Sequence, residues 1–234
     1  MRQLTVVFLM LLIVCAPVSA KARKGSVTVQ ARENLLDKLP ADVAYLLSEY
    51  TGAVLYRNDG GMSEGKINIC LVDNSIRFVD EKGDTLLMRN PAMVNRIILA
   101  DGSVCVPVNG EYVRQLAAAG SRSLVYRVRL ELDTRDDSPS GGIAPPPTST
   151  AVTASLMELD PSRSFSVTTV VDYDLSEGFC LTDGDKFYPA RQSSFVRLFP
   201  DRKKDIKAYT KEHPVDYDSK EDITALFMYC AQGN

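Results

Sequence analysis

Few residues of this chain have the types and spacing that catalysis needs. The chain holds one histidine, His213, so a Ser-His-Asp or Cys-His site would have to use that residue. His213 precedes Pro214 in a charged segment where a helix is expected to end, and an imidazole there would complement the helix dipole. A zinc site built from the usual His and Cys ligands is disfavoured because histidine is so scarce. We therefore predict no catalytic residues, no metal site and no cofactor.

The cysteines could supply redox chemistry or cross-links. Beyond the first twenty residues they are far apart and form no C-x-x-C pair, which excludes zinc-ribbon and thioredoxin-like motifs. In an oxidising compartment they could form two disulfides of unknown pairing. They also lie in apolar strand and helix patterns, where buried free thiols would be expected, and the sequence leaves both alternatives open. The residues concerned are Cys70, Cys105, Cys180 and Cys230.

Carboxylates are plentiful but form no recognisable constellation. Acidic residues cluster at 133–137, and Asp183 and Asp185 flank Gly184. The Asp-Gly-Asp triplet could contribute oxygen ligands to Ca²⁺, but the spacing of a full calcium loop is missing and a hairpin turn explains the triplet. A carboxylate pair for glycoside hydrolysis depends on separation in space, which the sequence leaves open. No P-loop or dinucleotide-binding fingerprint occurs.

The charge balance and the composition argue against some classes of binding partner. The chain has 27 Lys and Arg against 30 Asp and Glu, which gives no general attraction to nucleic acid. It has no Trp, which weakens a carbohydrate-binding interpretation because sugar platforms use flat aromatic faces. An apolar fraction of 45% is ordinary for a folded protein.

The first twenty residues have the three parts of a secretory signal peptide. Arg2 is followed by the apolar run Leu4–Val14, and the segment ends in Val-Ser-Ala at Ala20. We predict cleavage after Ala20 and export to the periplasm or the outer membrane, with no transmembrane segment afterwards. The alternative to a cleaved signal is a membrane anchor, but this run has only about half of the roughly 20 residues needed to span a bilayer. Lipidation at Cys15 is the other alternative, but no small residue precedes that cysteine.

Residues 31–133 are expected to form a β-rich domain, after a short linker KARKGSVTVQ. ARENLLDKLP at 31–40 predicts a helical turn or two that Pro40 ends. Short apolar runs follow, split by turn signals such as Asp101-Gly102 and spaced about 8–12 residues apart, as in a sandwich or barrel. The final run, SLVYRVRLEL, alternates between apolar and charged residues. Its residues predicted to share one face are Leu124, Tyr126, Val128, Leu130 and Leu132.

The rest of the chain divides into a linker and a helical end. Residues 134–153 are rich in Pro, Ser, Thr and Gly and predict a flexible linker or long exposed loop. In 154–234, a hairpin across Asp183–Asp185 precedes helices that Pro200 and Ser219 are placed to begin. The predicted class is α+β: mostly antiparallel β-sheet, as a sandwich or small barrel, with a C-terminal hairpin and a cap of two to three helices.

The helical end also offers a candidate interaction surface. Its basic residues alternate with acidic ones, so a solvated face is expected, with contact to an acidic partner or lipid headgroups as the alternative. Three apolar residues before them are expected to pack on the sheet, with a partner-binding patch as the alternative. The candidate residues are Phe195, Leu198, Phe199, Arg202, Lys203, Lys204, Lys207 and Lys211.

Two stretches carry a resemblance to a known family. They are SSFVRLFPDRKKDIKAYTKEHPVDYDSKEDITALFMYC near the end and, earlier, TGAVLYRNDGG with the later GDTL and NP blocks. Over about residues 45–132 and 165–230 the chain resembles an uncharacterised family of small exported proteins common in Bacteroidetes. The resemblance implies an envelope location and a β-rich body with a helical end. It implies no reaction and no residue roles.

Export, scarce catalytic chemistry and the resemblance point to one class. We expect a non-enzymatic envelope protein, a binding or structural module whose partner is another envelope protein or a surface glycan or lipid. One alternative is a secreted hydrolase that acts on glycan, peptide or lipid through a carboxylate or Ser site. Another is a redox or stress role for the four cysteines.

Overall fold

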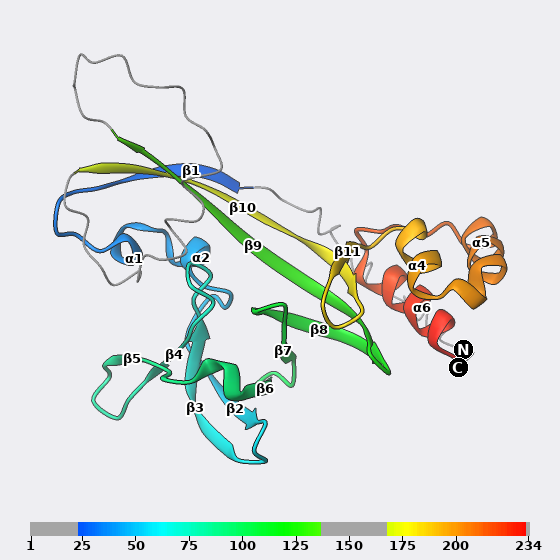
Figure 1. Cartoon of the computed structure of the whole chain (residues 1–234), viewed down its shortest axis with the longest axis horizontal. Coiled ribbons are helices and arrows are strands. Elements are labelled where there is room, and N and C mark those ends of the chain that lie inside the picture. Colours follow the sequence, from blue (N-terminus) through cyan, green and yellow to red (C-terminus); the bar gives the residue numbers. More distant parts are fainter. Residues whose placement is uncertain (1–22, 137–167, 233–234) are drawn as a thin grey trace, which may run out of the picture.

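The computed structural model describes residues 23–136 and 168–232, whose strands form one continuous antiparallel sheet (Figure 1). The strands are β1 (Arg23–Val29), β2 (Thr51–Arg57), β3 (Met62–Ile69), β4 (Ile76–Val79), β5 (Thr85–Leu87), β6 (Val94–Leu99), β7 (Val104–Val108), β8 (Glu111–Ala119), β9 (Arg122–Asp136), β10 (Thr169–Thr182) and β11 (Phe187–Pro189). Their order in the sheet is β1-β10-β9-β8-β7-β6-β2-β3-β4-β5, with β11 paired to β10. The path is open, so β1 and β5 are the edge strands at its two ends, and β11 is a further short edge strand beside β10.

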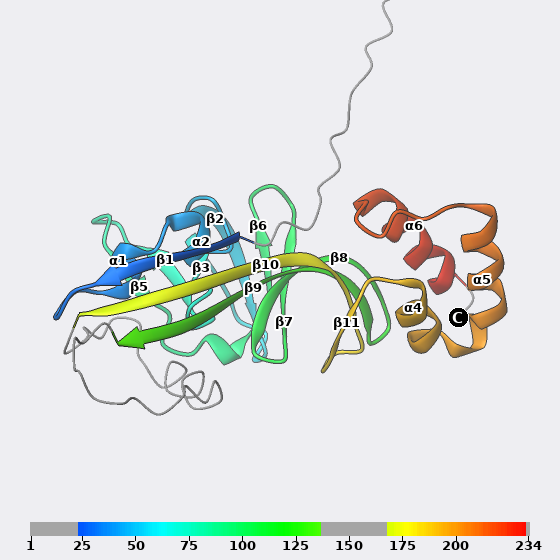
Figure 2. The ribbon, with the colours of Figure 1, turned by 90° about the horizontal axis from the view of Figure 1, so that it is seen from above.

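The helices lie at two places along this sheet. Short helices α1 and α2 follow β1, and the longer ones gather beyond the far end of β9 and β10 (Figure 2). None of the described helices is long and apolar enough to cross a bilayer. Their bounds are α1 (Leu35–Lys38), α2 (Ala41–Ala44), the 3₁₀ turn η1 (Pro91–Met93), α4 (Gln192–Leu198), the 3₁₀ turn η2 (Pro200–Arg202), α5 (Lys203–Glu212) and α6 (Lys220–Ala231).

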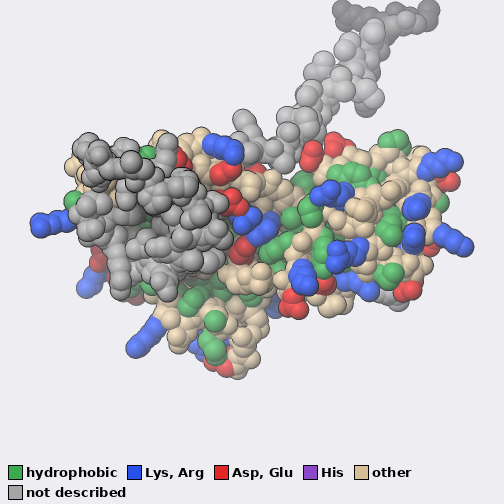
Figure 3. Space-filling view, turned by 45° about the horizontal axis from the view of Figure 1, so that its top comes forward, with side chains coloured by type: hydrophobic (Ala, Val, Ile, Leu, Met, Phe, Trp, Pro, Cys, Tyr) green, Lys and Arg blue, Asp and Glu red, His purple; other side chains and the backbone are tan. Residues whose placement is uncertain are grey.

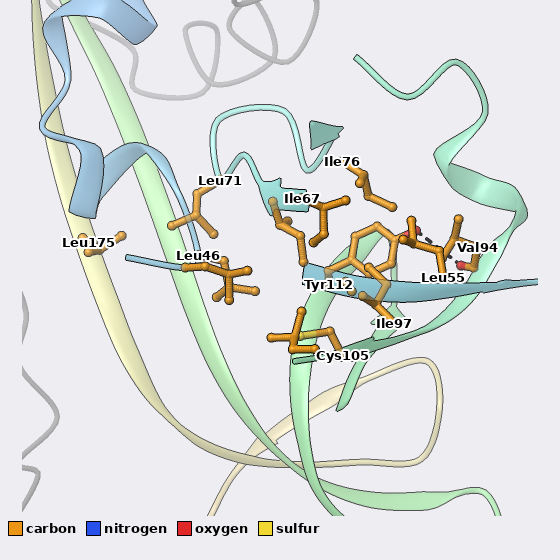
Figure 4. Packing of buried hydrophobic residues seen from close by; sticks show 14 residues of the cluster. Leu46, Leu55, Ile67, Leu71, Ile76, Val94, Ile97, Cys105, Tyr112 and Leu175 are labelled. Carbon is orange, nitrogen blue, oxygen red and sulfur yellow. Dashed lines mark hydrogen bonds between the residues drawn. The ribbon is translucent and has the colours of Figure 1, made fainter. Parts of the chain in front are cut away.

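The α+β class is confirmed, but the sheet is single and open where a sandwich or small barrel was expected. The main core, which is the buried cluster that contains Leu55, Ile67 and Leu175, explains how a single sheet can bury one of its faces. Leu55 of β2 and Ile67 of β3 belong to the same buried cluster as Leu175 of β10, although β10 lies at the other end of the strand order (Figure 4). The sheet therefore folds over on itself, and its long β9–β10 arm covers the inner face of the shorter strands.

Strand β9 has the alternation predicted for it. Leu124 packs in the helical end, Val128 packs against the main core, and Leu132 packs against the cluster beside β1. The opposite face was expected to be half exposed and polar, yet Val125 on it is fully buried in a small cluster with Val113. The prediction of one inward face is confirmed, and the outer face is apolar at one point as well.

Two segments depart from the sequence predictions. The segment predicted as a linker after the signal peptide contains β1, which pairs with β10 from Arg23↔Leu175 to Val29↔Thr169. That strand forms because of a partner distant in sequence, which no local pattern reveals. Of the linker predicted at 134–153, the first three residues belong to β9, and the others lie outside the described residues. β1, β9 and β10 belong to the same sheet as β2–β8, while the predicted domain division itself stays a prediction.

The C-terminal elements follow their sequence signals. The hairpin β10–β11 turns at Asp183–Asp185, and α5 ends before His213. Pro200 begins η2, one turn ahead of α5. The N-cap of α6 is Ser219, whose hydroxyl oxygen accepts the backbone N–H of Asp222 at 3.2 Å, as a capping residue should.

Candidate functional site

The four cysteines are free thiols in separate parts of the fold. Cys105 lies in the main core, Cys230 in the core of the helical end, and Cys180 beside the small outer cluster. Burial raises the pKa of Cys70, Cys105 and Cys230 to about 11. Thiols with such pKa values stay protonated near neutral pH and are poor nucleophiles. The structure brings no two of these four residues together as a disulfide.

The remaining predicted chemistry is accounted for by local structure. His213 is exposed after α5, with its ring 4.9 Å from that of Tyr209. The carboxylate of Asp183 accepts the backbone N–H of Lys186 at 3.0 Å and the hydroxyl of Tyr188 at 2.9 Å, and these bonds lower its pKa. Asp183 thus serves the hairpin turn. Within the described part of the chain, no group of three or more His, Cys, Asp or Glu side chains could hold a metal ion.

The predicted interaction residues divide into a buried set and an exposed set. Phe195, Leu198 and Phe199 are buried in the core of the helical end, so the packing expected for them is confirmed and they are not available on the surface. Arg202 pairs with Asp205 at 2.7 Å and lies over the ring of Tyr229. The exposed residues are Lys203, Lys204, Lys207 and Lys211.

The exposed lysines do not form a patch of one sign. Blue and red side chains are interspersed over the helical end (Figure 3), and Asp201, Asp205 and Glu212 are exposed on the same segment. A face of mixed charge is typical of a solvated helix surface rather than of a site for an anionic partner.

A cavity of about 730 Å³ lies along the β9–β10 arm and β1. Lys24 pairs there with Asp174, and Arg129 pairs with Glu131. These are surface ion pairs, which contribute little binding energy on their own. The further acidic residues that line the cavity are Asp133 and Asp172.

The edge strand β5 is the other place where the fold presents unused groups. Its hairpin with β4 is held by Asp80, whose carboxylate accepts the backbone N–H of Lys82 at 2.9 Å and of Asp84 at 2.8 Å. Gly83 supplies the positive φ of +90° that the turn needs. This local turn fixes the register in which Phe78 lies opposite Leu86.

The register decides which backbone groups of β5 are unused. The N–H of Met88 donates to the carbonyl of Ile76 at 2.9 Å, and the N–H of Asp80 donates to Asp84 at 3.0 Å. Because hydrogen-bonded and non-bonded pairs alternate along an antiparallel ladder, Phe78 and Leu86 form the hydrogen-bonded pair between them. The N–H and C=O groups of the two neighbours, Thr85 and Leu87, therefore point away from β4 to the open edge of the sheet.

The side chains at this edge are large, apolar and accessible. Leu86 is 42% exposed and Leu87 is 55% exposed. Leu86 is opposite Phe78, which packs on the main core, so Leu86 lies on the inner face of the sheet; Leu87 is opposite Arg77 and lies on the outer face. An exposed apolar edge strand with unpaired backbone groups is a template for pairing with another strand.

TLLM at 85–88 is one of the short apolar runs that predict strands within 31–133, but the pattern assigns it no role. Two leucines in sequence, between turn residues and Arg89, were the available signal, because a strand that buries one face should alternate. No protein-family model, no curated protein and no solved structure matches this chain. The candidate site therefore rests on the geometry of the edge.

Proposed function

We propose that this chain is a non-enzymatic exported protein of the cell envelope that works as a protein-binding module, and that the edge of β5 is its contact element. The observation that carries the proposal is the exposed pair Leu86 and Leu87 on a strand with an unused hydrogen-bonding edge. The envelope location is supported by the signal-peptide pattern ending at Ala20 and by the resemblance to exported Bacteroidetes proteins.

Strand addition would use both properties of this edge. An incoming strand would bond to the outward N–H and C=O groups of Thr85 and Leu87, which gives affinity without a specific sequence. Its side chains would cover Leu86 on one face and Leu87 on the other, and removing that apolar surface from water would favour association. The pattern of apolar residues on both faces sets which strands fit.

The test is cross-linking followed by capture of the tagged, exported protein from its own envelope. We expect one stoichiometric partner, and we expect Leu87→Lys to abolish its capture because a charge would be placed in the contact. The matched control is Met62→Lys, which puts the same charge on another exposed apolar residue, 65% exposed at the start of β3. Equal capture by wild type and Leu87→Lys would refute β5 as the contact element.

A further inference from the structure

We infer that the N-terminus created by signal cleavage lies in a gap of the sheet beside β10, with the α-ammonium group of Lys21 next to the carboxylate of Glu177. The inference rests on the export that the proposed function includes, and it is separate from the β5 contact. It follows from a break in the pairing of β10, from the register of β1 and from the surroundings of Glu177.

One edge of β10 is paired near both ends and unpaired between them. β9 pairs with β10 along its whole length, so β1 and β11 share the opposite edge, beside the two ends of β10 (Figure 1). β1 pairs there as far as Leu175, and β11 pairs from Cys180 onward. Next to β11, the N–H of Ala190 donates to the carbonyl of Phe179 at 2.9 Å. Within the described part of the chain, the gap therefore spans residues 176–178.

The backbone groups of Glu177 point into this gap. Along a strand, the N–H and C=O groups of alternate residues point to the same edge, and the carbonyl of Phe179 points to the edge where β11 lies. The N–H and C=O groups of Glu177 must therefore point to that edge as well. A strand residue opposite Glu177 would exchange two hydrogen bonds with it, as in the bonded pair of an antiparallel ladder.

The chain itself determines which residues can fill the gap. Arg23 is opposite Leu175 in the ladder, and two more residues in the same register would place Lys21 opposite Glu177. Predicted cleavage after Ala20 leaves two residues before β1, so the length of free chain matches the gap. These two residues lie outside the described part of the chain, and the register alone places them.

An uncleaved chain would not fit in the same way. In the register of β1, Ser19 would fall opposite Phe179, whose carbonyl already accepts the N–H of Ala190. The signal peptide would therefore have to leave the sheet before that point. Hydrolysis of the peptide bond between Ala20 and Lys21, with water as the co-reactant, leaves a carboxylate on the first residue and an α-ammonium group on the second. Cleavage thus creates the charge that the gap would receive.

The side chain of Glu177 lies on the inner face of the sheet. It stands between Leu175, which packs in the main core, and Phe179, which packs in the helical end. Tyr126 is opposite Phe179, and its phenol lies close to the carboxylate: burial first, and then Glu177, raise the pKa of Tyr126. The carboxylate is half-buried, and a neutral phenol beside it leaves its charge uncompensated.

The cations near this carboxylate have other partners. Arg23 and Arg114 both act on the phenol of Tyr126, but Arg23 pairs with Asp42. The guanidinium group of Arg114 donates to a backbone carbonyl at 3.5 Å. An ammonium group in the gap would therefore supply the carboxylate with a cation of its own. Since partly buried charges are screened less than exposed ones, this pair should stabilise the mature N-terminus.

The test compares proteins with defined N-termini. Sequencing of the exported protein should give Lys21 as its first residue. By hydrogen exchange, the protection of the Glu177 amide should fall about tenfold in a form that starts at Arg23, because one hydrogen bond is lost. The amide of Leu181, opposite Tyr188 of β11, should be unchanged and is the internal control. Equal protection of the Glu177 amide in both forms would overturn the inference.

The charge is tested by the pKa of the α-amino group, measured by NMR on protein with an isotope-labelled dimethyl group there. This pKa should fall by about 1 in Glu177→Gln, because the neighbouring carboxylate is removed. Glu64→Gln, the same change at an exposed position of β3, is the matched control and should leave it raised. An α-amino pKa that is the same in both variants would overturn the inference.

The sign of the pH dependence follows from the same pair. An α-amino pKa raised in the folded state means that the charged amine stabilises the fold. This contribution should be complete below the ordinary value of about 7.7–8.0 and should be lost as the pH rises through the folded value. Thermal unfolding of the form that starts at Lys21 should show this loss, and Glu177→Gln should not. The same alkaline loss in Glu177→Gln would count against the inference.

These outcomes are distinguishable from failure of the proposed function. An exported protein that begins at another residue would overturn the inference, while envelope capture that depends on Leu87 would still support the β5 contact. A protein that keeps residues 1–20 and is not exported would overturn both.

Discussion

The two edge strands at the ends of the strand order, β1 and β5, are built differently. β1 is seven residues long, and its residues alternate between exposed and covered positions, with Val29 fully buried against Leu35 and Val171. β5 is three residues long and all of them are exposed. The two edges therefore differ in what they contribute: β1 closes a core, whereas β5 adds surface.

The protection of the two edges differs as well. The guanidinium group of Arg23 donates to the carboxylate of Asp42 and, at 3.0 Å, to its backbone carbonyl, so α2 is attached to the start of β1. α1 covers the other end of β1 through Leu35. Charges and covering elements are common ways to keep an edge from pairing. β5 is protected only by being short. A short strand can pair with another strand weakly and reversibly.

The largest expected effect on the free energy of unfolding comes from placing a charge at a buried position of β1, compared with an exposed position of β5. Val29→Asp would place a carboxylate where the side chain is 0% exposed and should cost about 3–4 kcal/mol of unfolding free energy. Leu87→Asp should change it by less than about 0.5 kcal/mol. Urea unfolding of dilute, monomeric protein measures both. A large loss from Leu87→Asp would mean that β5 is structural after all.

A smaller loss of stability is expected from a substitution at Gly25, where β1 has no side chain. Gly25 lies opposite Tyr173, and a Cβ at Gly25 would collide with that phenol ring. Gly25→Ala should force the ring aside and cost about 1–3 kcal/mol. Gly65→Ala in β3 is the control, because nothing lies within 4 Å of the added carbon, and it should be neutral or stabilising by up to about 1 kcal/mol. Thermal unfolding of the two variants measures these stability changes. Equal changes would mean that the collision with the ring of Tyr173 does not destabilise the fold.

Local signals were sufficient for much of the fold. The turn at Asp183–Asp185, the cap at Ser219 and the inward face that begins at Leu124 depend on neighbouring residues and could be predicted. β1 could not, because its ladder with β10 is made with residues far along the chain. The single folded-over sheet was missed for the same reason, since Leu175 meets the main core only after the whole path is assembled.

The candidate site was harder to predict than the fold. Phe195, Leu198 and Phe199 lie in the core of the helical end, as expected, although a sequence pattern alone leaves a contact patch as the alternative. Leu86 and Leu87 looked like ordinary strand residues. Their position at the end of the strand order is what exposes them, and strand order is a property of the assembled sheet.

The ion pair that attaches α2 to β1 should have a modest effect. The side chains of Arg23 and Asp42 are 37% and 63% exposed, so solvent screens their attraction and the pair should contribute less than about 1 kcal/mol. A double-mutant cycle with Arg23→Ala and Asp42→Ala gives the coupling energy, which should fall further at high salt. A coupling energy well above that value would mean that the ion pair between Arg23 and Asp42, rather than the burial of Val29, holds β1 in place.

The smallest expected effect is on pH dependence at the end of β1. The pKa of Glu33 is lowered from 4.5, first by the side chain of Lys38 and then by the backbone N–H of Gln30, which donates to the carboxylate at 2.9 Å. A lowered pKa in the folded state means that the charged carboxylate stabilises it, fully above about pH 4.5 and less as pH falls through the folded value.

Gln30 directly follows β1, so its amide reports this contact. Between about pH 6 and pH 3, after correction for intrinsic exchange, its hydrogen-exchange protection should fall in the wild type and stay constant in Glu33→Gln. The amide of Leu86, which bonds to a backbone carbonyl of β4, should show no such step and serves as the internal control. A step of equal size at Leu86 would indicate general acid unfolding, and the two edges would then not differ in their response to acid.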